Sequence, residues 1–318
     1  MQISRANIPV YPISVHDIFQ RILTQDYGPF DAAGLPLVDY DRLFARNHIK
    51  HAGKIGTHYT PVTLAFFALG NFAQGNFHKL DSFVRHFREV AEWFLQHQVE
   101  ARNTGGVWLH RFPMPHLPIL LEYVPGAWIS AMAQGLAVSV LVRAYHAFNE
   151  KQFLESARQA LQPFQYSIFD GGVAYALPND QIFLEEFPAN PPMHVLNGAL
   201  FAALGLAEYL QIVEDEALSC VYQKVLAGIR TLLPRFETGY GSFYDLRRRQ
   251  IANAGYHDLH VRLLHAIGKL SDEKEFLATS QRWRTYRQSR VKRSCHWLAE
   301  RAWAVRRRMQ FNPARKSS

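Results

Sequence analysis

The chain has 318 residues and a mass of 36.5 kDa, and its content of 48% apolar and 13% aromatic residues excludes a protein that stays unfolded. Its two cysteines, Cys220 and Cys295, exclude a disulfide framework and a metal site of four thiolates. The net charge of +8 comes from residues 281–318, which carry 12 Lys and Arg against one acidic residue. This charge indicates a solvated basic tail and predicts no specific nucleic-acid partner.

The first part of the chain is predicted to be irregular. Glycine and proline punctuate residues 1–60 around one short helical pattern near 15–23, which indicates a lead-in packed on the main body. Pro61 is well placed to begin a helix, because its missing N–H is not needed in the first turn. A second helix follows from Asp81, with apolar residues three and four apart. Prolines and glycines then favour short extended segments over 105–125.

The rest of the chain alternates pairs of helices with loops rich in Gly, Pro and aromatic residues. Predicted helices cover 128–149, 151–163, 193–213, 214–233, 257–269 and 272–287, with an extended region at 165–190. This pattern predicts a mainly α fold over 61–288, an (α/α) barrel or toroid with short β segments and long rim loops, followed by the basic tail 289–318. A plain helical bundle is the alternative, and no fixed repeat favours a solenoid.

Three loop segments bring polar groups of the kinds needed for acid/base chemistry. They are 183–188 with two carboxylates, 237–247 with a tyrosine and an arginine, and 254–258 with a tyrosine beside a histidine. Removing the proton from a carbon beside a carboxylate requires a positioned base and a cation that neutralises the carboxylate. The loops therefore favour proton abstraction next to a carboxylate, while burial or helix capping is the structural alternative for each residue alone.

No sequence feature predicts a cofactor or a metal. Glycine-rich phosphate loops, zinc-protease motifs and nucleophile elbows are missing, and the histidine pairs three residues apart are expected by chance among 15 histidines. The longest apolar stretch, 128–148, is interrupted by polar residues, so no membrane span is predicted. Without a signal peptide, we expect a location in the cytoplasm or at the periphery of a membrane-bound polysaccharide-synthesis complex.

Several motifs resemble the carboxyl-terminal domain of D-glucuronyl C5-epimerases, which convert glucuronate to iduronate in precursors of heparan sulfate and heparin. The motifs are WISAMAQG at 128–135, LVRAY at 141–145, EEFP at 185–188, VLNG at 195–198, LPRFETG at 233–239, YDLR at 244–247, YH at 256–257 and RW at 282–283. They occur in the family's order between about residues 100 and 290, which makes the resemblance specific. The amino-terminal β-rich region and the membrane anchor of the animal enzymes are expected to be missing here.

The resemblance implies an (α/α) barrel that acts on uronate residues of an acidic polysaccharide such as heparosan, taking the C5 proton from one face and returning one to the other. On matching positions it implies Glu186, Tyr244 and Tyr256 as catalytic acid/base groups. Arg247 is implied as the partner of the substrate carboxylate. The other implied substrate-binding residues are His257, Gln134, Asn197 and Trp128. Packing between inner helices is the alternative for the last three.

One position departs from the pattern, since the animal enzymes have a tyrosine implicated in catalysis where this chain has Phe187. This leaves two alternatives open. One is a uronan lyase, in which the same carbanion eliminates the 4-linked sugar, and the other is a carbohydrate-binding protein without activity. A terminal helix with Trp297 and Trp303 is a candidate homodimer interface.

Overall fold

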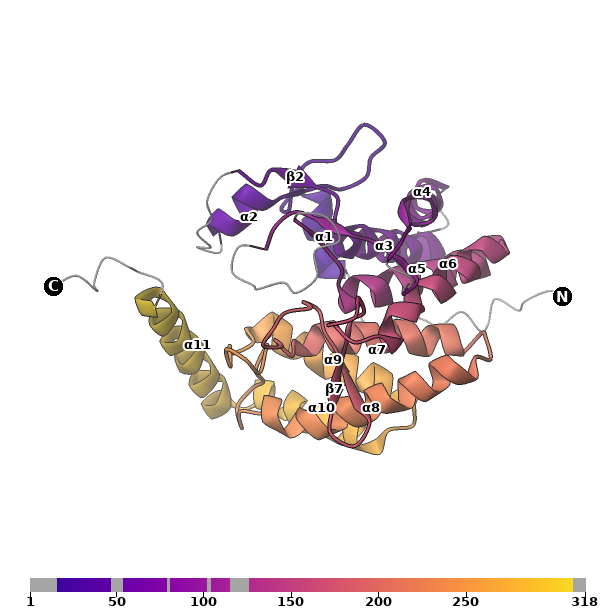
Figure 1. Ribbon diagram of the computed structural model, residues 1–318. Helices are drawn as coiled ribbons and strands as arrows, with labels where there is room; N and C mark the ends of the chain where they lie inside the picture. The colour runs from indigo at the N-terminus through magenta and orange to yellow at the C-terminus, as the bar shows by residue number, and fades with distance from the viewer. Residues whose placement is uncertain (1–15, 47–53, 79–80, 102–103, 115–125, 311–318) are drawn as a thin grey trace.

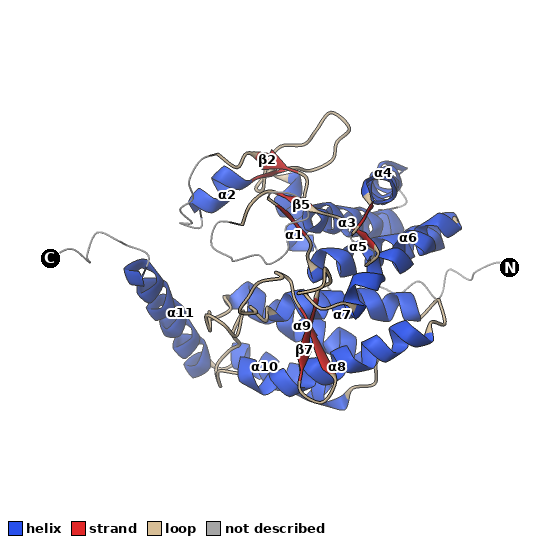
Figure 2. Cartoon of the chain, in the orientation of Figure 1, coloured by secondary structure: helices blue, strands red, loops and turns tan. Residues whose placement is uncertain are grey.

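The computed structural model describes residues 16–46, 54–78, 81–101, 104–114 and 126–310. Within these ranges the chain forms 11 α-helices and four small antiparallel sheets of two strands each (Figures 1 and 2). This confirms the mainly helical (α/α) fold that the sequence predicts. Part of the expected extended region, 115–125, lies outside the described residues.

Four inner helices form the centre of the fold. They are α3 (Pro61–His78), α5 (Ala131–Phe148), α7 (Leu196–Leu210) and α9 (Ala254–Leu270), and each packs beside the next. Residues 131–144 of α5 and 196–209 of α7 are buried without a polar face, as expected for helices covered on all sides. The two backbones approach closely at Gly135 and Gly205, where a methyl group would overlap the facing main chain.

Each inner helix carries an outer helix that packs on it. These are α4 (Asp81–His97) on α3, α6 (Lys151–Leu161) on α5, α8 (Glu216–Phe236) on α7 and α10 (Lys274–Gln288) on α9. The outer helices are amphipathic; in α4, for example, Phe87, Val90 and Phe94 are buried while the opposite side is solvated. Four helical hairpins in a row therefore make the alternating inner and outer layers of the barrel.

A buried ion pair joins α5 to α7 away from their amino-terminal ends. The Arg143 guanidinium donates from Nη1 and Nη2 to the two carboxylate oxygens of Glu208, at 2.8 and 2.9 Å, and both side chains have no exposed surface. Nη1 also donates to the main-chain oxygen of Ser139 at 2.7 Å. In this bidentate ion pair, each buried charge is compensated by the other.

The amino-terminal segment packs against the first hairpin. It contains α1 (His16–Leu23), α2 (Tyr40–Arg46) and a sheet of β1 (Val38–Asp39) and β2 (Thr57–His58). Phe19 of α1 lies directly on Gly70 of α3, where a methyl group would overlap its ring. The short helix near 15–23 is therefore confirmed, while the division of the chain at residues 60 and 288 stays a prediction.

Short strands connect the hairpins. The pairs are β3 (Val99–Glu100) with β4 (Gly106–Val107), β5 (His110–Arg111) with β6 (Ala127–Trp128), and β7 (Ala174–Leu177) with β8 (Gln181–Leu184), the last after the 3₁₀ helix η2 (Gln162–Gln165). β4, β5, β7 and β8 lie in the extended regions predicted over 105–125 and 165–190, whereas β3 and β6 lie just outside them.

Three inner helices begin at other residues than their periodicity predicts, and α7 begins at Leu196, three residues after the predicted start at 193. α5 begins at Ala131, because Trp128 belongs to β6 and the Ser130 hydroxyl caps the helix. α9 begins at Ala254, three residues early, because the Asn253 side chain accepts from the main-chain N–H of Tyr256 at 2.9 Å. Tyr256 is thereby placed in the first turn of α9.

The last helix, α11 (Arg290–Gln310), lies at the edge of the molecule beside α10 (Figure 1). His296 is buried, and its Nε2 atom lies 2.8 Å from the main-chain oxygen of Ala252. Trp297 and Leu298 are more than half exposed. Across the described ranges, no helix has the length and apolar content required to cross a bilayer.

Candidate active site

A cavity of about 200 Å³ lies where the amino-terminal ends of the four inner helices meet. The first turns of these helices contribute Val62 and Thr63 of α3, Met132 of α5, Asn197 of α7 and Tyr256 of α9. Connecting loops contribute Glu186 and Tyr244, and the amino-terminal segment contributes Ile18, Ile22 and Tyr27. Because helix amino termini carry partial positive charge, this end of the fold favours a negatively charged group.

Glu186 is positioned at the end of the β7–β8 hairpin. The preceding residue, Glu185, anchors the loop: its main-chain N–H donates to Val173, and its main-chain oxygen accepts from Ala131 at the start of α5. Its buried carboxylate accepts from the main-chain N–H of His194 at 3.0 Å and lies 2.5 Å from the ring Nδ1 of the same residue. Fixing residue 185 in this way directs residue 186 toward the cavity.

The surroundings of the Glu186 carboxyl shift its pKa toward neutral pH. Burial, with the neighbouring negative charge of Glu185 as the second cause, raises the pKa of Glu186 to about 8. Its Oε2 atom is buried and accepts no hydrogen bond from any residue in the described ranges. Gly198 makes room for it, since a β-carbon there would lie 2.7 Å from Oε2 and 2.6 Å from the Glu186 β-carbon.

Tyr244 reaches the cavity from the loop between α8 and α9. Main-chain hydrogen bonds fix this loop: the main-chain oxygen of Tyr244 accepts from Leu196 at 3.1 Å, and its N–H donates to Gln250 at 2.6 Å. Gly239 allows the turn before it, with a φ of 82° that favours glycine. Burial raises the pKa of Tyr244 well above its ordinary value, and the charge of Glu186 adds to the effect.

Tyr256 lies beside Tyr244, with ring centroids 4.9 Å apart in an edge-to-face arrangement. The side chain is 39% exposed, which fits a residue on the wall of an accessible cavity. Loss of solvation and the charge of Glu186 raise the pKa of Tyr256 to about 12, whereas the positive charge of Arg21 acts in the opposite direction. At neutral pH both phenols are therefore protonated and able to donate.

Asn197 completes the polar part of the cavity. The side chain is 2% exposed, its Nδ2 lies 3.8 Å from the sulfur of Met132, and its Oδ1 accepts no hydrogen bond from the described part of the chain. A buried acceptor without a donor is rare in folded proteins and is found at sites that receive a ligand. Asn197 thus offers an acceptor to a hydroxyl group in the cavity.

Three residues implied by the resemblance lie elsewhere in the described structure. The Gln134 amide bonds to main-chain atoms of Gly106, Trp108 and Ala160. Trp128 donates from Nε1 to Phe112 and stacks on His110, and Phe187 packs against it with ring centroids 5.4 Å apart. His257 is buried, with Nδ1 2.9 Å from the Ser242 hydroxyl and Nε2 3.2 Å from the Trp283 oxygen. Substrate contacts by these residues stay predictions.

The arginine whose positive charge acts on both Glu186 and Tyr244 is Arg248, one position after the predicted Arg247. Arg247 is exposed and donates from Nη1 to the main-chain oxygen of Pro191 at 3.0 Å. Arg248 is paired with Asp245, with Nε 3.2 Å from Oδ2, and its positive charge acts against the larger effect of burial, which raises the pKa of both Glu186 and Tyr244. The run of three arginines at 247–249 gives no sequence signal to distinguish them.

Sequence reasoning also missed the wall that the amino-terminal segment provides. Ile18, Ile22 and Tyr27 line the cavity, although they lie far in sequence from the loops that carry the polar groups. Ile18 and Ile22 belong to a short amphipathic helix, a pattern that predicts burial of one helix face but does not identify the element that covers it. As a whole, the cavity holds one carboxyl group, three phenols, one amide and the hydroxyl of Thr63 around a space partly lined with apolar side chains.

Comparison with known proteins finds a family model and relatives that match this chain. A family model described as the D-glucuronyl C5-epimerase C-terminus matches residues 102–285. A protein of Caenorhabditis elegans named D-glucuronyl C5-epimerase is 34% identical over 218 residues, which cover 63% of this chain and 34% of the relative. An uncharacterized protein of Methanocaldococcus jannaschii is 28% identical over 193 residues, covering 59% of this chain and 60% of the relative. The chain therefore spans about a third and about three fifths of the lengths of these relatives.

Among solved structures, cellobiose 2-epimerase from Spirochaeta thermophila is similar to this chain. The TM-score is 0.50 at 14% sequence identity, and the match covers 83% of this chain and 65% of that one. At this identity the likeness concerns the fold alone.

Proposed function

Because the chain belongs to the D-glucuronyl C5-epimerase C-terminal family, we propose that it epimerises D-glucuronate to L-iduronate residues within heparosan or a related uronan. The observation that supports this proposal most is the meeting of Glu186, Tyr244 and Tyr256 around one cavity, although they come from two separate loops and the first turn of α9. The substrate of this reaction class is an acidic polysaccharide, and the helix amino termini around the cavity suit its carboxylate.

The proposed reaction begins with the ionised Glu186 carboxylate as the base. It takes the C5 proton, so the C–H bond breaks, an O–H bond forms on Glu186 and the electron pair spreads into the sugar carboxylate. Positive helix ends and the Arg248 guanidinium stabilise the added negative charge. Asn197 Oδ1 accepts a hydrogen bond from a sugar hydroxyl and holds the ring.

A phenol then returns a proton to the opposite face of C5. We assign this step to Tyr256, whose O–H bond breaks as the new C5–H bond forms. The positive charge of Arg21 stabilises the phenolate that is left. Exchange with water restores the proton of Tyr256 and removes that of Glu186. Tyr244, in edge-to-face contact with Tyr256, donates to the sugar carboxylate in this scheme.

Exchange of hydrogen at C5 tests the proposal directly. Heparosan incubated with the protein in deuterated water should acquire deuterium at C5, and iduronate should appear. Tyr256→Phe should slow exchange by on the order of 10²-fold or more, whereas Tyr166→Phe, on the exposed surface after η2, should leave it unchanged. Folded protein that exchanges no C5 hydrogen in any uronan tested would refute the proposal. Absorbance from unsaturated uronate in the same tube would assign lyase activity instead.

A further inference from the structure

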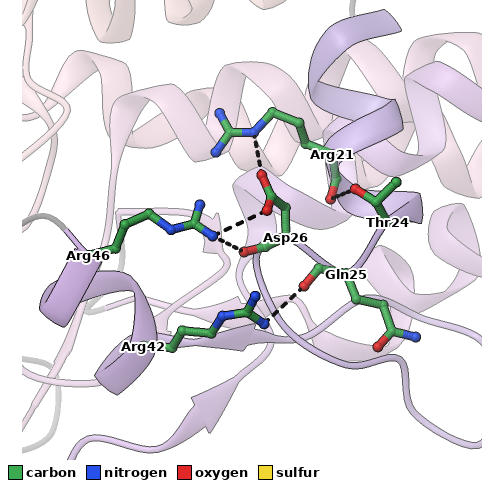
Figure 3. Close-up of polar contacts among 6 residues, drawn as sticks. All are labelled: Arg21, Thr24, Gln25, Asp26, Arg42 and Arg46. Atoms are coloured by element: carbon green, nitrogen blue, oxygen red, sulfur yellow. Dashed lines mark hydrogen bonds and ion pairs between the residues drawn. The ribbon is translucent and has the colours of Figure 1, made fainter.

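Three arginines of the amino-terminal segment surround one short turn (Figure 3). Arg21 of α1 donates from Nε to Asp26 Oδ2 at 2.9 Å, and Arg46 of α2 donates from Nη2 to Asp26 Oδ1 at 3.2 Å. Arg42 of α2 donates from Nη1 to the main-chain oxygen of Gln25 at 3.3 Å. The single carboxylate of Asp26 thus faces three guanidinium groups, which leaves the arginine cluster (Arg21, Arg42 and Arg46) with excess positive charge.

The arginine cluster is open to solvent. The side chains of Arg21 and Arg46 are 50% and 39% exposed, and Arg42 is exposed as well. In the hydrogen bonds given above each guanidinium uses one nitrogen. A guanidinium has two further nitrogens in a planar fork, which matches the geometry of a carboxylate or a sulfate. The cluster therefore has the charge and the donors to hold an anion.

The arginine cluster adjoins the candidate active site. Tyr27 lines the cavity and follows Asp26 in the chain, and the Arg21 guanidinium carbon lies 4.9 Å from the centre of the Tyr27 ring. Ile18 and Ile22, on either side of Arg21 along α1, also line the cavity. The charge of Arg21 acts on Tyr256 across this wall. When the reacting ring of a polymer occupies the cavity and the rest of the sugar chain extends along α1, the neighbouring sugar residues lie close to the cluster.

From this placement we propose that Arg21, Arg42 and Arg46 form an anion-binding subsite for the sugar chain beside the reacting residue. The subsite holds the anionic substituent of a neighbouring residue, a uronate carboxylate or a sulfate, and Asp26 orients two of the guanidinium groups. The inference rests on the proposed function, because it takes its ligand from the same polymer. It adds a requirement that the acid/base groups do not impose: tight binding needs a second anionic sugar.

The test compares a long heparosan chain with a heparosan oligosaccharide that contains a single glucuronate. Arg42→Gln should raise KM for the long chain about threefold, and Arg42→Gln with Arg46→Gln about tenfold, as expected for exposed charge pairs. The turnover number should stay the same, and KM for the single-glucuronate substrate should not change. Arg158→Gln, which removes an exposed arginine of α6 paired with Asp215, is the matched control.

A purely structural role for the cluster predicts a different result. Asp26→Asn keeps the size of the side chain and one acceptor oxygen but removes the negative charge, so the net positive charge around the turn rises by one. The subsite predicts a KM for long heparosan about twofold lower, with stronger dependence on salt. A structural role predicts a higher KM and a lower melting temperature. An N-sulfated polymer identifies the source of the anion, since a larger effect of Arg42→Gln on that polymer assigns the subsite to sulfate and an equal effect assigns it to carboxylate.

Two outcomes separate this inference from the proposed function. If the wild-type protein exchanges C5 hydrogen but the double arginine variant has an unchanged KM for long heparosan, the subsite is refuted and the epimerase survives. If the wild-type protein exchanges no C5 hydrogen in any uronan tested, the proposed epimerase activity is refuted. Calorimetric binding of long heparosan by the wild-type and arginine variants then decides the subsite alone, and equal dissociation constants would overturn it.

Discussion

The two ends of the α5–α7 helix pair differ in whether their buried polar groups have hydrogen-bond partners. Away from the cavity, Arg143 and Glu208 have no exposed surface and bind each other through two hydrogen bonds. At the amino-terminal end, the Asn197 amide oxygen and one oxygen of Glu186 are buried without a hydrogen-bond donor in the described ranges. A buried polar group without a partner costs free energy of folding. The comparison indicates that the first end serves stability and the second serves a ligand.

The largest effect is expected from Glu186→Gln, which tests whether the unsatisfied carboxyl is functional. C5 deuterium exchange should fall by about 10²- to 10⁴-fold, because the amide cannot take the proton. The free energy of unfolding at pH 7 should not fall, because the amide is neutral like the protonated carboxyl it replaces. Glu92→Gln, on the surface of α4, is the control for exchange. A variant that keeps its rate would remove Glu186 from the mechanism.

Arg143→Ala tests the opposite end and should act on stability. Leaving the Glu208 carboxylate buried alone should lower the free energy of unfolding by about 3–5 kcal/mol, measured by urea denaturation. Arg158→Ala on α6 breaks a pair whose arginine is 59% exposed, so a loss of at most about 1 kcal/mol is expected. Replacing both partners, with Arg143→Met and Glu208→Leu, should recover most of the loss. Equal losses for the buried and exposed pairs would contradict the comparison.

The raised pKa of Glu186 predicts that activity and stability change with pH in opposite directions. The rate at low substrate should rise with pH, reach half of its maximum near 8 and level off above it, because the base must be ionised. Stability should change in the other direction. The unfolded carboxyl ionises near its ordinary value of about 4.3, so the contribution of Glu186 is greatest below that pH and is lost as pH rises through about 8. Glu186→Gln should flatten this part of the stability profile, and an unaltered profile would show that the pKa is ordinary.

Gly198→Ala is expected to have a smaller effect on the rate. Alanine normally favours a helix, but its β-carbon would lie 2.6 Å from that of Glu186 and would displace the carboxyl. We expect a decrease in exchange of about tenfold, since small misplacements of a reacting group are costly. The control is Gly255→Ala in α9, where the nearest neighbouring atom of an added β-carbon lies at 3.5 Å. Unchanged exchange in the Gly198 variant would show that the carboxyl position is not critical.

The smallest effect is expected at Phe187, where animal relatives have tyrosine. Phe187 is 8% exposed and packs on Trp128 and not on the cavity, so Phe187→Tyr should change the exchange rate by less than about threefold. Phe183→Tyr, in the completely buried part of β8, is the control for the cost of burying a hydroxyl. A large gain in rate at position 187 would mean that the missing phenol limits activity.

The fold was predictable from the sequence because apolar spacing distinguishes the amphipathic outer helices, and because Pro and Gly separate the pairs. The ends of helices were harder: Ser130 and Asn253 decide where α5 and α9 begin, through capping bonds that periodicity does not show. Glu186, Asn197, Tyr244 and Tyr256, which line the cavity, were found through motifs.

Other parts of the site were beyond sequence reasoning. Gln134 and His257 are polar residues in motifs, yet their partners are main-chain and buried groups, and a residue that bonds internally has the same sequence signature as one that binds a ligand. Tyr27 joins the cavity only through the docking of α1 on α3, a tertiary contact for which a single sequence contains no signal.

The docking of Phe19 on Gly70 has a consequence for dissecting the protein. The matched family region begins at residue 102, but part of the cavity wall comes from residues 18–27 and 62–66. An excised fragment limited to the matched region would retain the proton-transfer groups and lose the partition that shields them from bulk water. The acid/base candidates and part of their enclosure are thus encoded in different stretches of the chain, and a foreign amino-terminal segment would change the cavity wall and remove the Arg21 charge that acts on Tyr256.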